Sequence, residues 1–231
     1  MTTKLYLIPG TMCTELLWSL VKPLLDQSIE LVHLDIPKNM SFDQLAEHFD
    51  NVFIEEKVSI VGFSLGGYIA TYYAMKYPHR VEKIFSIANS PTSLRRNELK
   101  ARREALKYFE DNEYTGMSRA RIVSFLDNDN HDPKIIDLIK QMDKQQGHEQ
   151  LVSQYEHTSN RQDLSEAVIS FPFKTHFYYS DFDPMINNDW FDEIRTKSAN
   201  LSFFSTSGSG HMLPLEKPKE LASYINAWAQ L

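Results

Sequence analysis

The chain has 231 residues, of which 42% are hydrophobic and 12% aromatic, and this is enough to build the core of one large domain. Its net charge of −7 argues against a general binder of nucleic acids or anionic membranes. One cysteine excludes an internal disulfide framework, and no apolar run reaches the length of a membrane span. The first apolar run, residues 5–8, is too short for a secretion signal, so we expect a cytoplasmic protein.

Short apolar runs alternate with amphipathic segments along most of the chain. The runs that predict buried strands are residues 5–8, 31–34, 58–61, 81–88, 176–179 and 201–204. The segments that predict helices are residues 15–25, 42–49, 68–77, 190–197 and 219–230, the second of them capped by Ser41. This alternation predicts an α/β fold, with a mostly parallel sheet of about six strands and helices on both faces.

Residues 91–170 interrupt the alternation. They are rich in charged and amide side chains, contain no strand pattern, and place apolar residues at the spacing of several short helices. Because they are inserted between two predicted strands, we expect a helical cap over the carboxyl ends of the sheet, where such sheets bind ligands. The predicted core then consists of residues 1–90 and 171–231.

A short glycine-containing motif joins the third predicted strand to the next helix. It reads Gly62-Phe63-Ser64-Leu65-Gly66, with the nucleophile candidate Ser64 at its centre. A serine hydroxyl attacks well when it projects from a tight strand-to-helix turn, and small residues two positions away let strand and helix approach each other. The motif therefore predicts a nucleophile elbow.

A serine nucleophile needs a base and a group that orients this base. His211 follows the last predicted strand among small residues, which would let its ring reach Ser64. Asp181 and Asp183 both follow the preceding strand. We favour Asp183, because Pro184 makes the turn after it rigid, whereas Asp181 is suited to capping that turn.

The oxyanion of an acyl-transfer reaction needs two N–H donors. We expect one from Leu65, at the start of a helix, and the other from Thr11, with Met12 as the second choice. Cys13, in the same loop, is interpreted as a small buried residue, because no histidine adjoins it and no second cysteine could complete a redox cycle. An apolar acyl pocket is predicted from the side chains that flank these positions, namely Met12, Trp18, Phe63, Met212 and Leu213.

A basic run lies in the predicted cap, at Arg95, Arg96, Lys100, Arg102, Arg103 and Lys107. We interpret it as a solvated helix face, because Glu98 and Glu104 are interleaved with it; contact with an anionic substrate is the alternative. The cap histidines show no metal-ligand spacing, so the sequence predicts neither a metal site nor a cofactor.

Taken together, the motifs make the chain resemble an α/β-hydrolase-fold serine hydrolase, in particular a small capped esterase-like member. The resemblance covers nearly the whole chain. Its motifs are the oxyanion strand and loop at 7–12, the elbow at 62–67, the acid loop at 183–184, and the base loop at 210–211 with Glu216 and Pro218. They follow one another in the family order of Ser, Asp and His. Residues 158–164 also resemble a segment that precedes the acid strand in capped members.

The chain departs from the family pattern in three places. Pro9 stands where a histidine is common, and the loop at 36–41 lacks the usual glycines. The chain opens at the oxyanion strand, without the antiparallel hairpin that precedes it in many members. Ser64 as the nucleophile argues against a haloalkane dehalogenase, which uses an aspartate.

The resemblance implies hydrolysis of a small-molecule carboxylic ester through an acyl-enzyme on Ser64. An acyl thioester is the second choice of substrate, and the same residues could open a lactone or hydrolyse a carbon–carbon bond. The alternative from another class is a binding protein of the same fold that has no catalytic activity. The presence of all three residues, Ser64, Asp183 and His211, argues against it. The expected partner is thus a small acyl substrate rather than a nucleic acid or a membrane.

Overall fold

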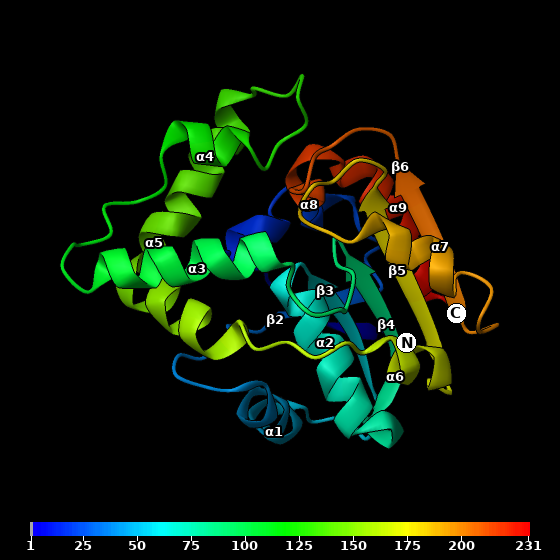
Figure 1. Ribbon diagram of the computed structural model, residues 1–231. Coiled ribbons are helices and arrows are strands. Elements are labelled where there is room, and N and C mark those ends of the chain that lie inside the picture. The colour runs from blue at the N-terminus through cyan, green and yellow to red at the C-terminus, as the bar shows by residue number, and fades with distance from the viewer. Residues whose placement is uncertain (1) are drawn as a thin grey trace.

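Six parallel strands form one sheet at the centre of the computed structural model, which describes residues 2–231 (Figure 1). They are β1 (Thr3–Ile8), β2 (Ile29–His33), β3 (Val58–Phe63), β4 (Val81–Ile87), β5 (Lys174–Ser180) and β6 (Leu201–Thr206). Their order across the sheet is β2-β1-β3-β4-β5-β6, with every neighbouring pair parallel. The predicted α/β fold with about six parallel strands is confirmed.

Helices pack on both faces of the sheet because its strands are apolar on both sides. Within β1, Tyr6 and Ile8 belong to one buried cluster, and Leu5 and Leu7 belong to the other. The first cluster contains side chains of α1 (Phe42–Val52), α2 (Leu65–Lys76), α6 (Ser165–Ser170) and α7 (Asn188–Ile194). The second contains side chains of α8 (Leu213–Glu216) and α9 (Pro218–Ala229). This is the alternation expected of strands that are covered on two faces.

Helix α1 begins where the sequence predicts. The Ser41 hydroxyl accepts the N–H of Gln44, and the Gln44 side chain accepts the N–H of Ser41. This reciprocal pair is a capping box, which satisfies two donors at the start of a helix that otherwise have no partner.

The prediction of one helix over residues 15–25 is wrong. The structure has two 3₁₀ turns instead, η1 (Glu15–Trp18) and η2 (Lys22–Leu24). Pro23 has no N–H and its ring clashes with the preceding turn, so an α-helix cannot continue through it. The leucines of this stretch do not share one buried face, since Leu20 is 38% exposed while Leu17 is fully buried.

The interval between β4 and β5 contains α3 (Arg96–Phe109), α4 (Arg119–Val123), α5 (Pro133–Thr158) and α6. The first three form a lobe of helices beside the sheet, whereas α6 lies next to α2 (Figure 1). Helix α5 is interrupted at Gly147, where φ is 70°. We call residues 91–170 the helical insertion; the placing of the domain boundaries at 90/91 and 170/171 stays a prediction.

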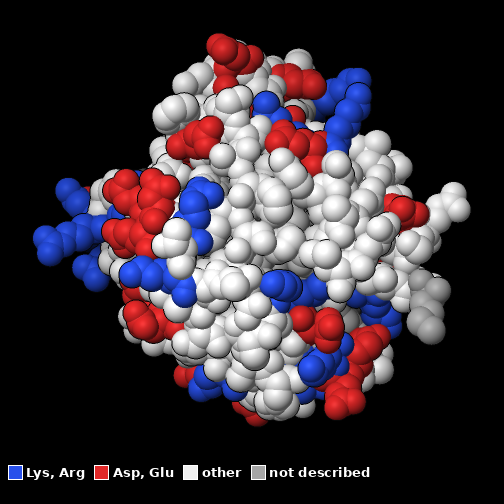
Figure 2. Space-filling model, turned by 90° about the vertical axis from the view of Figure 1, so that its right-hand side faces the viewer, with Lys and Arg blue, Asp and Glu red and all other residues white. Residues whose placement is uncertain are grey.

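On the face toward which α7 and β6 lie, charged side chains gather near the margins and alternate in sign, while the centre is mostly uncharged (Figure 2). None of the helices in residues 2–231 is both long enough and apolar enough to cross a membrane.

Candidate active site

Ser64 lies at the turn between β3 and α2, in a strained backbone conformation. Its φ is 51° and its ψ is −114°, a region that a residue with a side chain rarely adopts. The turn is tight enough that a Cβ at Gly66 would collide with the carbonyl oxygen of Ile8 in β1. The strand, turn and helix therefore hold the Ser64 hydroxyl at the carboxyl end of the sheet, as expected for a nucleophile elbow.

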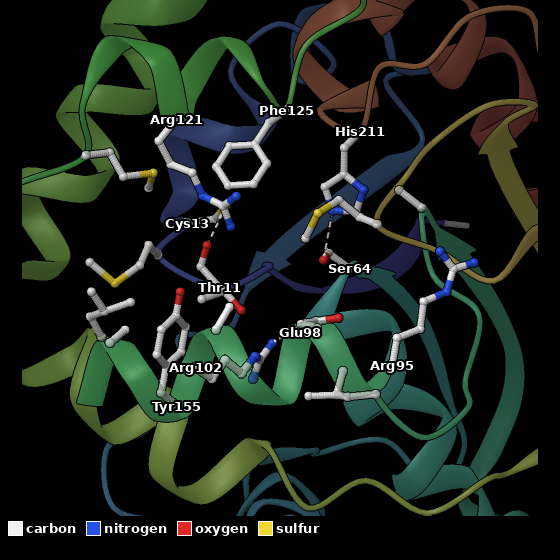
Figure 3. A pocket seen from close by; sticks show the side chains of 18 of the residues that line it. Thr11, Cys13, Ser64, Arg95, Glu98, Arg102, Arg121, Phe125, Tyr155 and His211 are labelled. Atoms are coloured by element: carbon white, nitrogen blue, oxygen red, sulfur yellow. Dashed lines mark hydrogen bonds and ion pairs between the residues drawn. The ribbon is translucent and has the colours of Figure 1, made fainter. Parts of the chain in front are cut away.

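A chain of hydrogen bonds connects Ser64 to two residues from the far end of the sequence. His211 Nε2 lies 3.0 Å from Ser64 Oγ, and His211 Nδ1 lies 2.6 Å from Asp183 Oδ2 (Figure 3 shows the first contact). Asp183 is 1% exposed and His211 is 5% exposed, so water competes little for either contact. With Asp183 accepting at Nδ1, Nε2 is free to take the serine proton.

The loop after β5 places its two aspartates differently. The second oxygen of Asp183 accepts the N–H of Met185 at 2.8 Å, which fixes the carboxylate in the plane it presents to His211. Asp181 is exposed and does not contact the histidine. Of the two candidates, the structure therefore brings Asp183 to His211.

Two backbone N–H groups near Ser64 are free to bind an oxyanion. Leu65 is the first residue of α2, where the helix dipole also favours negative charge. Neither Leu65 N–H nor Thr11 N–H has a hydrogen-bond partner among residues 2–231. The N–H of Met12, by contrast, donates to Gln154 Oε1 in α5 at 3.0 Å. The geometry thus favours Thr11 over Met12 as the second donor.

A cavity of about 590 Å³ opens beside Ser64, between the sheet and the helical insertion. Three of the predicted pocket residues, Met12, Phe63 and Met212, line it. Trp18 and Leu213 are not in its wall. Both are buried in the apolar cluster on the sheet face that α8 and α9 cover, where η1 and α8 pack together. The predicted pocket is therefore wrong at these two positions, because adjacency to a catalytic loop in sequence does not decide which way a side chain points.

The loop of His211 is tied to the helical insertion by bonds that the sequence analysis did not predict. The N–H of His211 donates to the carbonyl oxygen of Phe125 at 2.8 Å. The carboxylate of Glu216 accepts the N–H groups of Asp127 at 2.7 Å and Met212 at 3.1 Å. Burial raises the pKa of Glu216. Only the position of Glu216 in the base loop hinted at this role; Phe125 contributes a backbone atom, for which a sequence gives no signal.

Cys13 lies in the cavity wall but is unsuited to act as a nucleophile. Burial raises the pKa of its thiol to about 12, so the thiolate is scarce at neutral pH. Its sulfur contacts the carbonyl oxygen of Thr11 at 3.5 Å. Both facts agree with the interpretation of Cys13 as a small buried residue.

The basic run of α3 does not form one solvated face, and for Arg102 that interpretation is wrong. Arg102 is 8% exposed, lines the cavity, and donates from Nη2 to Glu98 at 2.9 Å. Arg95 also lines the cavity, whereas Arg103 is exposed and lies outside its wall. The sequence did not indicate which side of α3 is buried. Charged residues occur along the whole helix, and few apolar residues mark one side of it.

Comparison with known proteins decides the family. The model of the alpha/beta hydrolase fold family matches residues 27–218, which is most of the chain. The chain belongs to this family. This α/β-fold hydrolase also matches a curated relative, the abhydrolase domain-containing protein abhd-5.2 of Caenorhabditis elegans, with 62% identity over 29 residues. That match spans only 13% of this chain and 6% of the relative.

Solved structures share the fold over nearly the full length of this α/β-fold hydrolase. An esterase of Thermogutta terrifontis with malate bound has a TM-score of 0.82 at 19% identity, with 98% of this chain and 89% of the esterase covered. The enol-lactonase of Burkholderia xenovorans has a TM-score of 0.83 at 12% identity, with coverage of 100% and 92%. A meta-cleavage product hydrolase of Pseudomonas fluorescens has a TM-score of 0.78 at 18% identity, with coverage of 99% and 90%. At these identities the likeness concerns the fold alone.

Proposed function

We propose that the chain is a serine hydrolase that cleaves a small-molecule carboxylic ester through an acyl-enzyme. The observation that carries the proposal is the hydrogen-bond chain from Asp183 through His211 to Ser64, at 2.6 and 3.0 Å. The two free N–H groups of Leu65 and Thr11 and the adjoining cavity supply the other requirements of acyl transfer.

The proposed reaction has two halves. His211 Nε2 takes the proton of Ser64 as its oxygen attacks the ester carbonyl, and Asp183 holds the imidazole in the required tautomer and stabilises its charged form. The N–H groups of Leu65 and Thr11 bind the oxyanion, each contributing about 3 kcal/mol of barrier lowering. His211 then returns the proton to the leaving alcohol. Water, activated by the same histidine, releases the acid and restores Ser64.

Labelling with a fluorophosphonate probe tests this proposal, combined with hydrolysis of p-nitrophenyl acetate and butyrate. We expect mass spectrometry to locate the probe on Ser64, and we expect Ser64→Ala to lose both labelling and turnover. Turnover that survives in Ser64→Ala would overturn the mechanism. Absence of both labelling and turnover in the unaltered chain would favour a binding protein of this fold.

Three other acyl substrates fit the same residues. A thioester, a lactone and an activated carbon–carbon bond all place a carbonyl carbon before a serine nucleophile. The ester is placed first because esterases are prominent among the structural neighbours, and a lactonase and a carbon–carbon hydrolase are also there. Labelling of Ser64 without hydrolysis of simple esters would direct the search to these three classes.

A further inference from the structure

Two arginines of the helical insertion lie near each other in the wall of the cavity that contains Ser64. Arg102 comes from α3, and Arg161 follows the end of α5. The guanidinium of Arg102 lies 5.0 Å from the centre of the Tyr155 ring, and that of Arg161 lies 5.0 Å from the centre of the Tyr68 ring. Because each guanidinium stacks on an aromatic face, its position is largely fixed before a ligand arrives.

Neighbouring residues neutralise only part of the positive charge of Arg102 and Arg161. Arg102 Nη2 donates to Glu98 Oε1 at 2.9 Å. Arg161 Nε donates to the carbonyl oxygen of Thr158 at 3.1 Å, but its two terminal nitrogens have no hydrogen-bond partner among residues 2–231. Burial, with repulsion from Arg102, lowers the pKa of Arg161 to about 9. The cluster therefore consists of two guanidinium cations and one carboxylate, so the described residues leave one positive charge of the cluster uncompensated.

The rest of the cavity wall also carries more positive than negative charge. Arg95 and Arg121 also line the cavity, and within the described chain the carboxylates of the wall are Glu98 and Glu113. Figure 3 shows Arg95, Arg102 and Arg121 around the space that Ser64 faces. Cations thus outnumber carboxylates in this wall, although the whole chain has a net charge of −7. Such a local reversal of sign in a cleft attracts an anionic ligand.

We propose that the substrate of this enzyme carries a carboxylate group and that Arg161, assisted by Arg102, binds it. The free terminal nitrogens of a guanidinium match the two oxygens of a carboxylate. Within the group formed by Arg102, Arg161 and Glu98, one carboxylate balances the positive charge that remains after Glu98 is paired with Arg102. The inference rests on the proposed function: Ser64 attacks the ester carbonyl, and the arginines select which esters are bound.

A purely structural role is the competing explanation. The carbonyl groups at the end of α5 attract cations, and Arg102 also lies 3.5 Å from the Thr158 hydroxyl and 3.4 Å from the Ser159 hydroxyl. On that explanation the arginines fasten α3 to the end of α5 and have no preference among substrates. The two explanations differ in whether acidic and neutral esters respond differently.

The first experiment compares paired substrates on the unaltered enzyme. The p-nitrophenyl monoesters of succinic, glutaric and adipic acid are matched with neutral branched acyl esters of the same length. We expect kcat/KM to be about 10-fold or more higher for the acidic member of at least one pair, and the advantage to shrink in 0.5 M salt. Equal values, or a preference for the neutral ester in all three pairs, would overturn the carboxylate proposal. In that outcome the proposed hydrolase function would still be supported, because the neutral esters are hydrolysed. If neither member of any pair is hydrolysed, the result counts against the proposed function instead.

The second experiment removes one charge at a time. Arg161→Gln is expected to lower kcat/KM for the acidic ester at least about 10-fold more than for its neutral partner. Arg103→Gln is the matched control, because it removes an exposed arginine from outside the cavity wall. If Arg161→Gln affects both esters of a pair equally, the arginine has only a structural role and the proposal fails.

The third experiment needs no variant and therefore does not depend on folding of Arg161→Gln. Hexanoate, hexyl phosphate and hexanol compete with p-nitrophenyl butyrate for the unaltered enzyme. We expect hexanoate to inhibit best. Stronger inhibition by hexyl phosphate would overturn the choice of a carboxylate, and stronger inhibition by hexanol would overturn the anion site altogether.

Discussion

The side-chain oxygen of Gln154 accepts the backbone N–H of Met12 at 3.0 Å, although 142 positions separate the two residues. Gln154 is a buried residue of α5, whereas Met12 belongs to the loop that offers the Thr11 N–H. Met12 has a φ of 57°, a left-handed conformation that is uncommon for a residue with a long side chain. The helical insertion therefore helps to hold this loop in its strained conformation.

Replacing Gln154 by leucine is expected to disturb this loop. The substitution leaves the buried N–H of Met12 without an acceptor, at a cost of about 1–3 kcal/mol. Relaxation of the loop would displace the Thr11 donor, so we expect kcat for p-nitrophenyl butyrate to fall about 10-fold or more, with a smaller change in KM.

Gln150→Leu is the matched control for this prediction. Gln150 lies one turn earlier in α5, is also buried, and donates to the carbonyl oxygen of Ile36 at 2.8 Å. Both variants lose a buried hydrogen bond, but only Gln154→Leu should lower kcat. Equal kcat values in the two variants would show that Gln154 does not position the loop.

The two aspartates after β5 give a second prediction. Asp183→Asn should lower kcat about 10³- to 10⁴-fold while leaving KM similar, because an amide can donate to Nδ1 and so stabilise the wrong tautomer of His211. Asp181→Asn is the control, since Asp181 is exposed and does not contact the histidine. Steady-state kinetics with p-nitrophenyl butyrate measures both. A large loss of kcat in Asp181→Asn would contradict the assignment of Asp183.

The sheet and the residues at its carboxyl edge were predictable because each follows from a local pattern. Apolar runs marked all six strands, and the Gly62–Gly66 motif had to form a turn at the end of one of them. Loops that follow neighbouring parallel strands meet at one edge, so His211 and Asp183 were expected beside Ser64. The local pattern failed at residues 15–25, where an amphipathic segment predicted one helix although it contains Pro23.

The cavity wall was less predictable because it depends on how the helical insertion packs. Gln154 and Arg102 lie in polar stretches in which nothing local marks the buried side of a helix, and Arg161 lies in the loop after α5. The orientation of Trp18 and Leu213 is likewise a tertiary property, set by the contact between η1 and α8. The proposed preference for an acidic ester therefore depends on the packing of the insertion and not on a local sequence pattern.

Glu216 gives the third prediction. Its carboxylate accepts Asp127 N–H, Asn130 Nδ2 and Met212 N–H at 2.7, 3.0 and 3.1 Å, so it joins the insertion to the loop of His211. Glu216→Ala leaves buried donors unpaired, which should reduce the free energy of unfolding by about 2–3 kcal/mol and lower kcat.

Glu220→Ala is the control for the third prediction. Glu220 accepts the hydroxyl of Thr206 at 3.1 Å but has no contact with the loop of His211. Urea unfolding and kcat are measured for both variants. Unchanged kcat in a folded Glu216→Ala enzyme would show that the network stabilises the fold without positioning the histidine.

His176 gives a prediction about stability in acid. It lies in β5 between the rings of Phe85 and Phe204, with centroids 6.0 and 5.3 Å away. Burial, assisted by Lys174 and Lys83, lowers its pKa to about 4. The unfolded chain, in which a histidine has a pKa near 6.5, therefore binds more protons than the native state between about pH 4 and pH 6.5. The contribution of neutral His176 to the free energy of unfolding is fully present above pH 6.5 and is lost as the pH falls toward 4.

His176→Phe should remove this dependence, because phenylalanine stays uncharged and packs between the same rings. Urea unfolding at pH 7.5 and pH 4.5 measures the free energy of unfolding of both proteins. On lowering the pH, we expect the unaltered enzyme to lose of the order of 2 kcal/mol more than the variant. His79→Phe, which replaces an exposed histidine, controls for the loss of a histidine as such. If the unaltered enzyme and His176→Phe lose the same free energy between the two pH values, His176 does not control stability in acid.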